Sequence, residues 1–121
     1  MKDFLIVGLG GFIGSAARYG VYLLTAKLYF EKPYLGTLIV NLLGCFLIGI
    51  LSGELIKINN QTGLFLIAGL CGGFTTFSTF ALDGLKLIRD GMITQFIFYA
   101  SVSMIGGLIV CLIGLYLMNK A

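Results

Sequence analysis

The side chains best suited to bind an ion gather in one short segment of the chain, residues 72–80. The segment reads GGFTTFSTF, so it combines a glycine pair with four hydroxyl groups and three phenylalanines. Hydroxyl groups donate and accept hydrogen bonds, and the positive edge of an aromatic ring attracts an anion without offering it a formal charge. These residue types favour an ion site made of neutral groups.

Two pairs within the segment share a helical face, because the members of each pair are three residues apart. Phe77 and Phe80 form an aromatic pair whose ring edges can turn toward an anion, and Thr76 and Thr79 form a hydroxyl pair. The hydroxyls of Ser78 and Thr79 can donate hydrogen bonds along the same path. The spacing predicts a polar path beside two aromatic rings.

The same segment is a poor continuous helix. Its paired glycines and β-branched threonines have low helix propensity, which predicts a break near residues 72–76. A helix interrupted at membrane depth exposes carbonyl and N–H groups to an ion, and protein or a cavity must cover them. A simple glycine kink is the structural alternative.

Three further positions carry polar or small groups at helical spacing. Tyr99, Ser103 and Gly107 recur every four residues and form one stripe, which predicts a second wall of the path or, alternatively, a face packed into the core.

Two polar residues lie within the first two apolar stretches. Arg18 lies about two-thirds along the first apolar stretch, where it faces an anion-attracting vestibule or extends to the lipid headgroups. The side-chain amide of Asn41 either contributes hydrogen-bonding groups to the ion path or forms a hydrogen bond between two helices.

Four apolar stretches must position these residues. Of 121 residues, 59% are hydrophobic and 11% are charged, with a mean hydropathy of +1.05, whereas soluble domains carry about 25% charged residues. A membrane-spanning helix needs about 20 apolar residues. We predict one all-α membrane domain over residues 1–121, its third helix broken, with helices at about 4–25, 35–58, 64–87 and 93–118.

The composition argues against an enzyme and against a metal site made of side chains. The chain has no histidine, which excludes an imidazole base or a His-rich centre. Cys45, Cys71 and Cys111 show no CxxC spacing and are expected to be buried thiols. A proton-coupled cation exporter needs a carboxylate at the membrane centre, but all acidic residues fall near predicted helix ends or in loops: Asp3, Glu31, Glu54, Asp83 and Asp90.

The cationic loop residues give a weak orientation signal. Four spans place three of them on one side of the membrane and four on the other: Lys2, Lys57 and Lys120 against Lys27, Lys32, Lys86 and Arg89. So small a bias favours insertion in both orientations, and opposed copies then pair as an antiparallel, dual-topology homodimer. The alternative is one orientation set by features that the count misses. The 18 glycines provide small faces for helix packing in either case.

Taken together, these motifs resemble the Fluc or CrcB family of fluoride channels over nearly the whole chain. The first helix contributes GGFIG followed by Arg18 and Tyr19, and the second contributes GTLIVN, which ends at Asn41. The GGFTTFSTF segment is the most specific element. Two positions depart from the family pattern: Asp83 stands where glutamate is common, and Gly107 stands where some relatives have a hydroxyl residue.

The resemblance implies a dual-topology homodimer with two fluoride pathways and a structural sodium ion at its centre. The sodium ligands are expected to be backbone carbonyls of both subunits. The resemblance assigns the carbonyls of Gly72 and Thr75 to sodium, and these residues to the fluoride pathway: Arg18, Asn41, Phe77, Ser78, Thr79, Phe80, Tyr99 and Ser103.

The function that this resemblance implies is passive export of cytoplasmic fluoride across the plasma membrane by a multi-pass protein. Its expected partners are fluoride, sodium, lipid and a second copy of the chain, without nucleic acid. The main alternative is a small multidrug-resistance exporter, whose first helix carries a membrane-embedded glutamate that is absent between Asp3 and Glu31. A structural membrane subunit is the second alternative.

Overall fold

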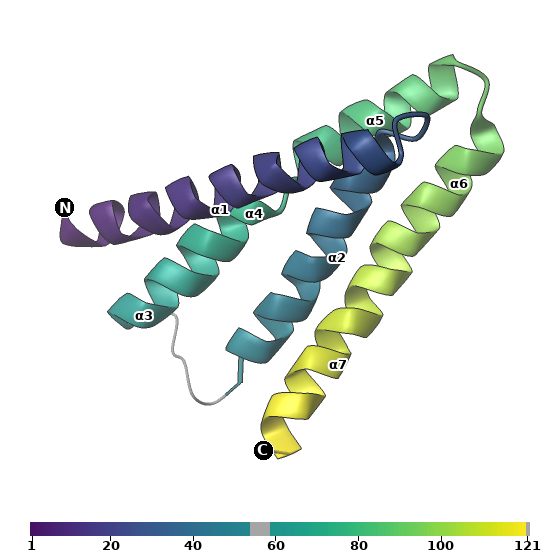
Figure 1. Ribbon diagram of the computed structural model, residues 1–121. Coiled ribbons are helices and arrows are strands. Elements are labelled where there is room, and N and C mark those ends of the chain that lie inside the picture. The colour runs from purple at the N-terminus through teal and green to yellow at the C-terminus, as the bar shows by residue number, and fades with distance from the viewer. Residues whose placement is uncertain (54–58, 121) are drawn as a thin grey trace.

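The computed structural model describes residues 1–53 and 59–120, and every regular element within those ranges is a helix (Figure 1). Four helical stretches are long and apolar enough to cross a membrane: Lys2–Leu28, Tyr34–Leu51, Gln61–Arg89 and Ile93–Lys120. This confirms the expected all-α architecture with four membrane-capable helices.

The third and fourth stretches are divided into shorter helical elements. Two of these elements, η1 and η2, have π-helical hydrogen bonding, which widens the helix locally. In chain order the elements are α1 (Lys2–Leu28), α2 (Tyr34–Leu51), α3 (Gln61–Gly63), η1 (Leu64–Cys71), α4 (Gly72–Phe74), α5 (Phe77–Arg89), α6 (Ile93–Ser101), η2 (Val102–Gly106) and α7 (Gly107–Lys120).

Several helix ends differ from the predicted ones. The first helix is longer at both ends than residues 4–25, since a charged side chain at a membrane surface does not end a helix. The second helix ends at Leu51, not at 58, and residues 54–58 lie outside the described residues. The third begins at Gln61, three residues early, because the Asn60 side chain caps it by accepting a 2.6 Å hydrogen bond from the Gly63 N–H.

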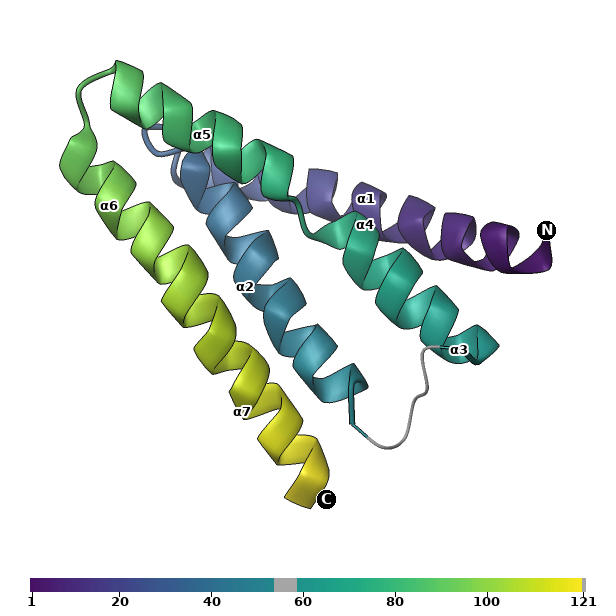
Figure 2. The ribbon, with the colours of Figure 1, turned by 180° about the vertical axis from the view of Figure 1, so that it is seen from behind.

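The helix interruption is confined to two residues. Thr75 and Thr76 have extended backbone angles, with φ of −85° and −151° and ψ of 158° and 118°. Figure 2 shows this short non-helical link between α4 and α5. The observed break is therefore shorter than the predicted one at residues 72–76. Gly72 and Gly73 are helical, so the glycine pair does not supply the extended conformation.

Two helix pairs are packed backbone against backbone. In the first pair, α1 lies along η1 and α4, and a Cβ atom at Gly14 would collide with the Leu70 carbonyl oxygen. In the second pair, α2 lies along α7, as both ribbon views show, and a Cβ atom at Gly49 would collide with the Cys111 carbonyl oxygen (Figures 1 and 2). Glycine is required at these positions for the helices to approach so closely.

A glycine-to-alanine pair tests this packing. We expect Gly14→Ala to lower the free energy of unfolding by about 1–3 kcal/mol, because the added methyl group forces α1 away from the third helix. The matched control is Gly20→Ala on the same helix, where a Cβ atom meets nothing within 4 Å. Thermal unfolding followed by circular dichroism in detergent measures the difference. Equal melting temperatures of the two variants would contradict the prediction.

Most large apolar side chains lie on the outside of the chain. Phe12 is 72% exposed and Leu108 is 75% exposed, for example, while Tyr34, Leu38 and Leu87 form a small buried cluster with Tyr99. An apolar outer surface of this kind suits contact with lipid hydrocarbon or with other membrane helices.

Candidate functional site

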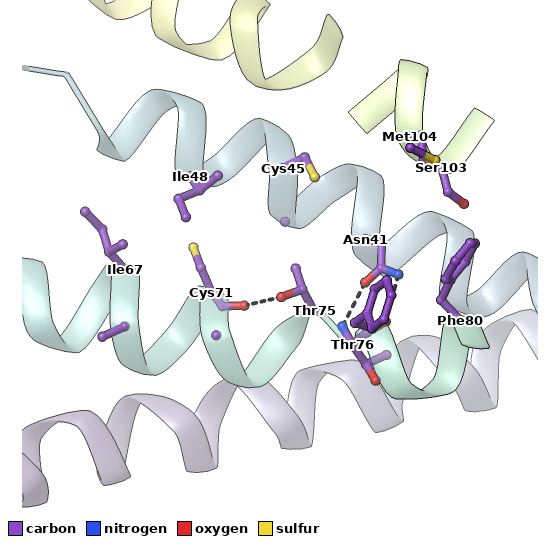
Figure 3. Close-up of a pocket in the computed structure, with 14 residues that line it drawn as sticks. Asn41, Cys45, Ile48, Ile67, Cys71, Thr75, Thr76, Phe80, Ser103 and Met104 are labelled. Carbon is purple, nitrogen blue, oxygen red and sulfur yellow. Dashed lines mark hydrogen bonds between the residues drawn. The ribbon is translucent and has the colours of Figure 1, made fainter. Parts of the chain in front are cut away.

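An open cavity of about 430 Å³ lies where the helix interruption faces α2 and η2 (Figure 3). We call it the break cavity. It brings together four of the residues expected in the ion path and both residues whose carbonyls were expected to bind sodium: Asn41, Phe77, Phe80 and Ser103, with Gly72 and Thr75. Residues far apart in the sequence therefore meet at one place.

The Asn41 side chain holds the interruption from α2. Its Oδ1 accepts a 2.8 Å hydrogen bond from the Thr76 N–H, and its Nδ2 donates a 3.0 Å hydrogen bond to the Thr76 carbonyl (Figure 3). One amide thus satisfies both backbone groups of a residue that lies outside any helix. An amide nitrogen carries two hydrogens, and among the described residues the second has no acceptor, so it is free to donate to a ligand in the cavity.

The interruption also frees backbone carbonyls. In a continuous helix the Gly72 carbonyl would accept from the Thr76 N–H, and the Thr75 carbonyl would accept from the Thr79 N–H. Instead, the Thr76 N–H bonds to Asn41, and the Thr79 N–H donates to Thr76 Oγ1 at 3.2 Å. The carbonyls of Gly72 and Thr75 are therefore available to other partners.

Arg18 supplies one such partner. Its Nη1 donates a 3.3 Å hydrogen bond to the Thr75 carbonyl, so the guanidinium lies against the interruption. Arg18 is not among the residues that line the break cavity. Its positive charge therefore lies beside the interruption, contributed by α1.

The two phenylalanines lie together at the cavity but in different surroundings. The ring centroids of Phe77 and Phe80 are 5.7 Å apart with a tilt of 38°, and those of Phe80 and Tyr99 are 5.1 Å apart with a tilt of 43°. Phe80 is therefore held by a neighbouring ring, whereas Phe77 is 80% exposed. Phe80 is the aromatic group whose position the chain itself fixes.

The hydroxyls of Ser78 and Thr79 do not line the cavity. They gather at the start of α5, where Thr76 Oγ1 lies 3.1 Å from Thr79 Oγ1 and 3.3 Å from Ser78 Oγ. Thr76 is the N-cap of this helix, so the hydroxyl pair that the sequence predicted is part of a cap.

Tyr99 is completely buried and lies behind the cavity wall, not on it. Its hydroxyl donates a 3.5 Å hydrogen bond to Asp83 Oδ2, which also accepts a 2.7 Å hydrogen bond from Thr37 Oγ1. Asp83 lies inside α5, since the helix continues to Arg89. This corrects the expectation that every acidic residue lies near a helix end or in a loop.

The sequence interpretation missed two members of this polar cluster. Thr37 is 1% exposed and lies one turn before Asn41 on α2, and Tyr22 of α1 brings its hydroxyl within 3.4 Å of the Thr37 hydroxyl. The four-residue spacing of Thr37 and Asn41 was the available signal, because it puts both polar groups on one helical face.

On the fourth helix the stripe of Tyr99, Ser103 and Gly107 does not act as a single wall. Ser103 lies in the π-helical segment η2 and lines the cavity, and its buried Oγ has no hydrogen-bond partner among the described residues. A Cβ atom at Gly107 would lie 3.3 Å from Cys45 Sγ, so a thiol from α2 occupies the space that a hydroxyl side chain would need.

The chain is similar in sequence to a known protein family and to individual proteins over most of its length. Residues 5–115 match the family described as CrcB-like protein, Camphor Resistance (CrcB). A fluoride-specific ion channel FluC of Chlorobium phaeobacteroides is 42% identical over 112 residues, covering 90% of this chain and 86% of that protein. Proteins of the same name from Azobacteroides pseudotrichonymphae and Elusimicrobium minutum are 41% and 46% identical, covering 94% and 96% of this chain and 94% and 90% of theirs.

Proposed function

Since the chain belongs to the CrcB family, we propose that it is a fluoride-selective channel that carries the anion passively out of the cell, down its electrochemical gradient. It is a multi-pass membrane protein and not an enzyme. The observation that carries the proposal is the break cavity, in which neutral hydrogen-bond donors and an aromatic ring converge at the helix interruption.

The donors of the break cavity match the chemistry of fluoride. Fluoride is small and strongly hydrated, so a selective pathway must replace its water with compact donors. Within the described residues, one Asn41 amide hydrogen and the Ser103 hydroxyl have no hydrogen-bond partner, and both are such donors. The Phe80 ring edge adds a weak positive potential. Phe77 also lines the cavity. Ser78, Thr79, Tyr99 and Arg18, which do not line it in a single chain, belong to the proposed pathway through the family resemblance alone.

Two features support an antiparallel homodimer with two pathways. The cavity is open on one side in a single chain, and a conducting path must be screened from lipid by protein. The cationic loop residues are nearly balanced across the membrane, which favours both orientations. A second, inverted copy placed over the cavity would close it and would bring two helix interruptions together.

The freed carbonyls fit a sodium ion at the centre of that dimer. Sodium is a hard cation that prefers oxygen ligands, and the carbonyls of Gly72 and Thr75 have lost their helical donors. Two oxygens from one chain are too few for such an ion, whereas two copies supply four. When bound, the ion supplies a fixed positive charge near the proposed anion path.

An efflux experiment tests the channel. Liposomes that contain the purified protein and equal concentrations of potassium fluoride and potassium chloride are diluted into fluoride-free and chloride-free buffer, and valinomycin then dissipates the charge. We expect fluoride to leave while chloride stays inside, as measured by ion-selective electrodes.

Two outcomes would contradict this proposal. Equal loss of chloride would show that the path is not selective. Release that needs a proton gradient would favour a proton-coupled exporter and would turn attention to Asp83, whose part-buried carboxylate accepts bonds from Thr37 and Tyr99.

A further inference from the structure

Arg18 carries a positive charge, and its side chain donates a hydrogen bond to a backbone carbonyl. Its side chain is half-buried, and Nη1 donates to the Thr75 oxygen at 3.3 Å across a sequence separation of 57 residues. A cation that binds the same oxygen competes with this contact.

The Thr75 carbonyl is also one of the two oxygens that we propose as sodium ligands. A guanidinium and a metal ion on one oxygen repel each other, because both are cations within a few ångströms in a region poor in water. We propose that Arg18 is a positioning residue that competes with sodium for the Thr75 carbonyl: the Arg18 hydrogen bond and a sodium ion exclude each other at this oxygen. This inference rests on the sodium site of the proposed function.

The competition has a second consequence, because coupling between two sites is reciprocal. If Arg18 weakens sodium binding, then bound sodium weakens the contact between Arg18 and Thr75 by the same factor. The displaced guanidinium has five N–H donors and is free to attract anions on the α1 side of the interruption. Bound sodium would then increase the attraction of anions in two ways: through its own positive charge, and by releasing the Arg18 guanidinium.

Sodium-dependent stability tests the proposal without measuring transport. The purified protein is unfolded by heat at constant ionic strength, with N-methylglucamine replaced stepwise by sodium. We expect Arg18→Gln to reach half of its sodium-induced stabilisation at a sodium concentration at least about tenfold lower than the wild type, because a competing cation is gone. Arg18→Met is a second neutral variant in case the first does not fold.

The matched control is Arg89→Gln, which removes the same charge from the exposed last turn of α5. Its sodium midpoint should equal that of the wild type. Equal sodium midpoints for the wild type and both neutral Arg18 variants would contradict the proposed competition without contradicting the sodium site. A higher midpoint in those variants would also overturn it, since Arg18 would then assist sodium. If sodium stabilises no variant, the sodium part of the proposed function fails together with this inference.

Discussion

Asn41→Asp is expected to abolish fluoride efflux. The aspartate keeps an acceptor for the Thr76 N–H but loses the donor to the Thr76 carbonyl, so two oxygens face each other where a 3.0 Å hydrogen bond was. It also places a negative charge in the cavity that we propose for fluoride. At a separation of about 5 Å and an effective dielectric constant of about 20, that repulsion costs about 3 kcal/mol, a factor of about 100 or more in rate.

The liposome assay with a fluoride electrode measures this effect, and size-exclusion chromatography verifies that the variant is folded. The matched control is Asn119→Asp, the same exchange at an exposed position near the end of α7. It should transport fluoride at the wild-type rate. Wild-type efflux by Asn41→Asp would remove Asn41 from the pathway and would also argue against its role in holding the interruption.

Phe80→Ile is expected to abolish fluoride efflux while the protein stays folded. Isoleucine fills much of the volume but has no aromatic edge, so the cavity loses its weakly positive surface. The lost stacking on Tyr99, at 5.1 Å between centroids, lowers stability by only about 0.5–1.5 kcal/mol. Efflux and thermal unfolding, measured on the same preparation, separate the two effects.

Phe12→Ile is the matched control for this exchange. Phe12 is 72% exposed on α1, on the apolar outer surface of the chain, and its replacement should leave efflux unchanged. If both variants lose efflux equally, the loss reflects general damage to the protein. If Phe80→Ile conducts like the wild type, the aromatic ring has no part in the pathway.

The membrane spans and the approximate position of the interruption could be predicted because local composition indicates where each lies. Apolar length alone specifies four spans, and low helix propensity places the break near Thr75 and Thr76. The end of α2 at Leu51 was not predicted, because the spans were assigned from hydropathy. Hydropathy does not detect the turn at Ser52 and Gly53.

The partners of the polar groups could not be predicted, because they depend on how the helices pack. The sequence shows that Asn41 lies at membrane depth, but its pairing with both backbone groups of Thr76 requires α2 to lie beside the interruption. Likewise, Asp83 and Thr37 are 46 residues apart and meet only when α2 and α5 are in contact. Helical periodicity predicts the helix face on which a residue lies, but it does not predict which residue of another helix packs against it.

The contact between Asn41 and Thr76 also bears on the order in which the protein is assembled. During synthesis α2 precedes the third helix, and an unpaired peptide group in hydrocarbon costs several kcal/mol. The segment around Thr76 is therefore expected to enter the bilayer as one continuous helix and to open only after α2 lies alongside and its amide takes over the backbone bonds. The interruption is then a product of tertiary folding, and substitutions in α2 can lead to a nascent chain with an unbroken third helix.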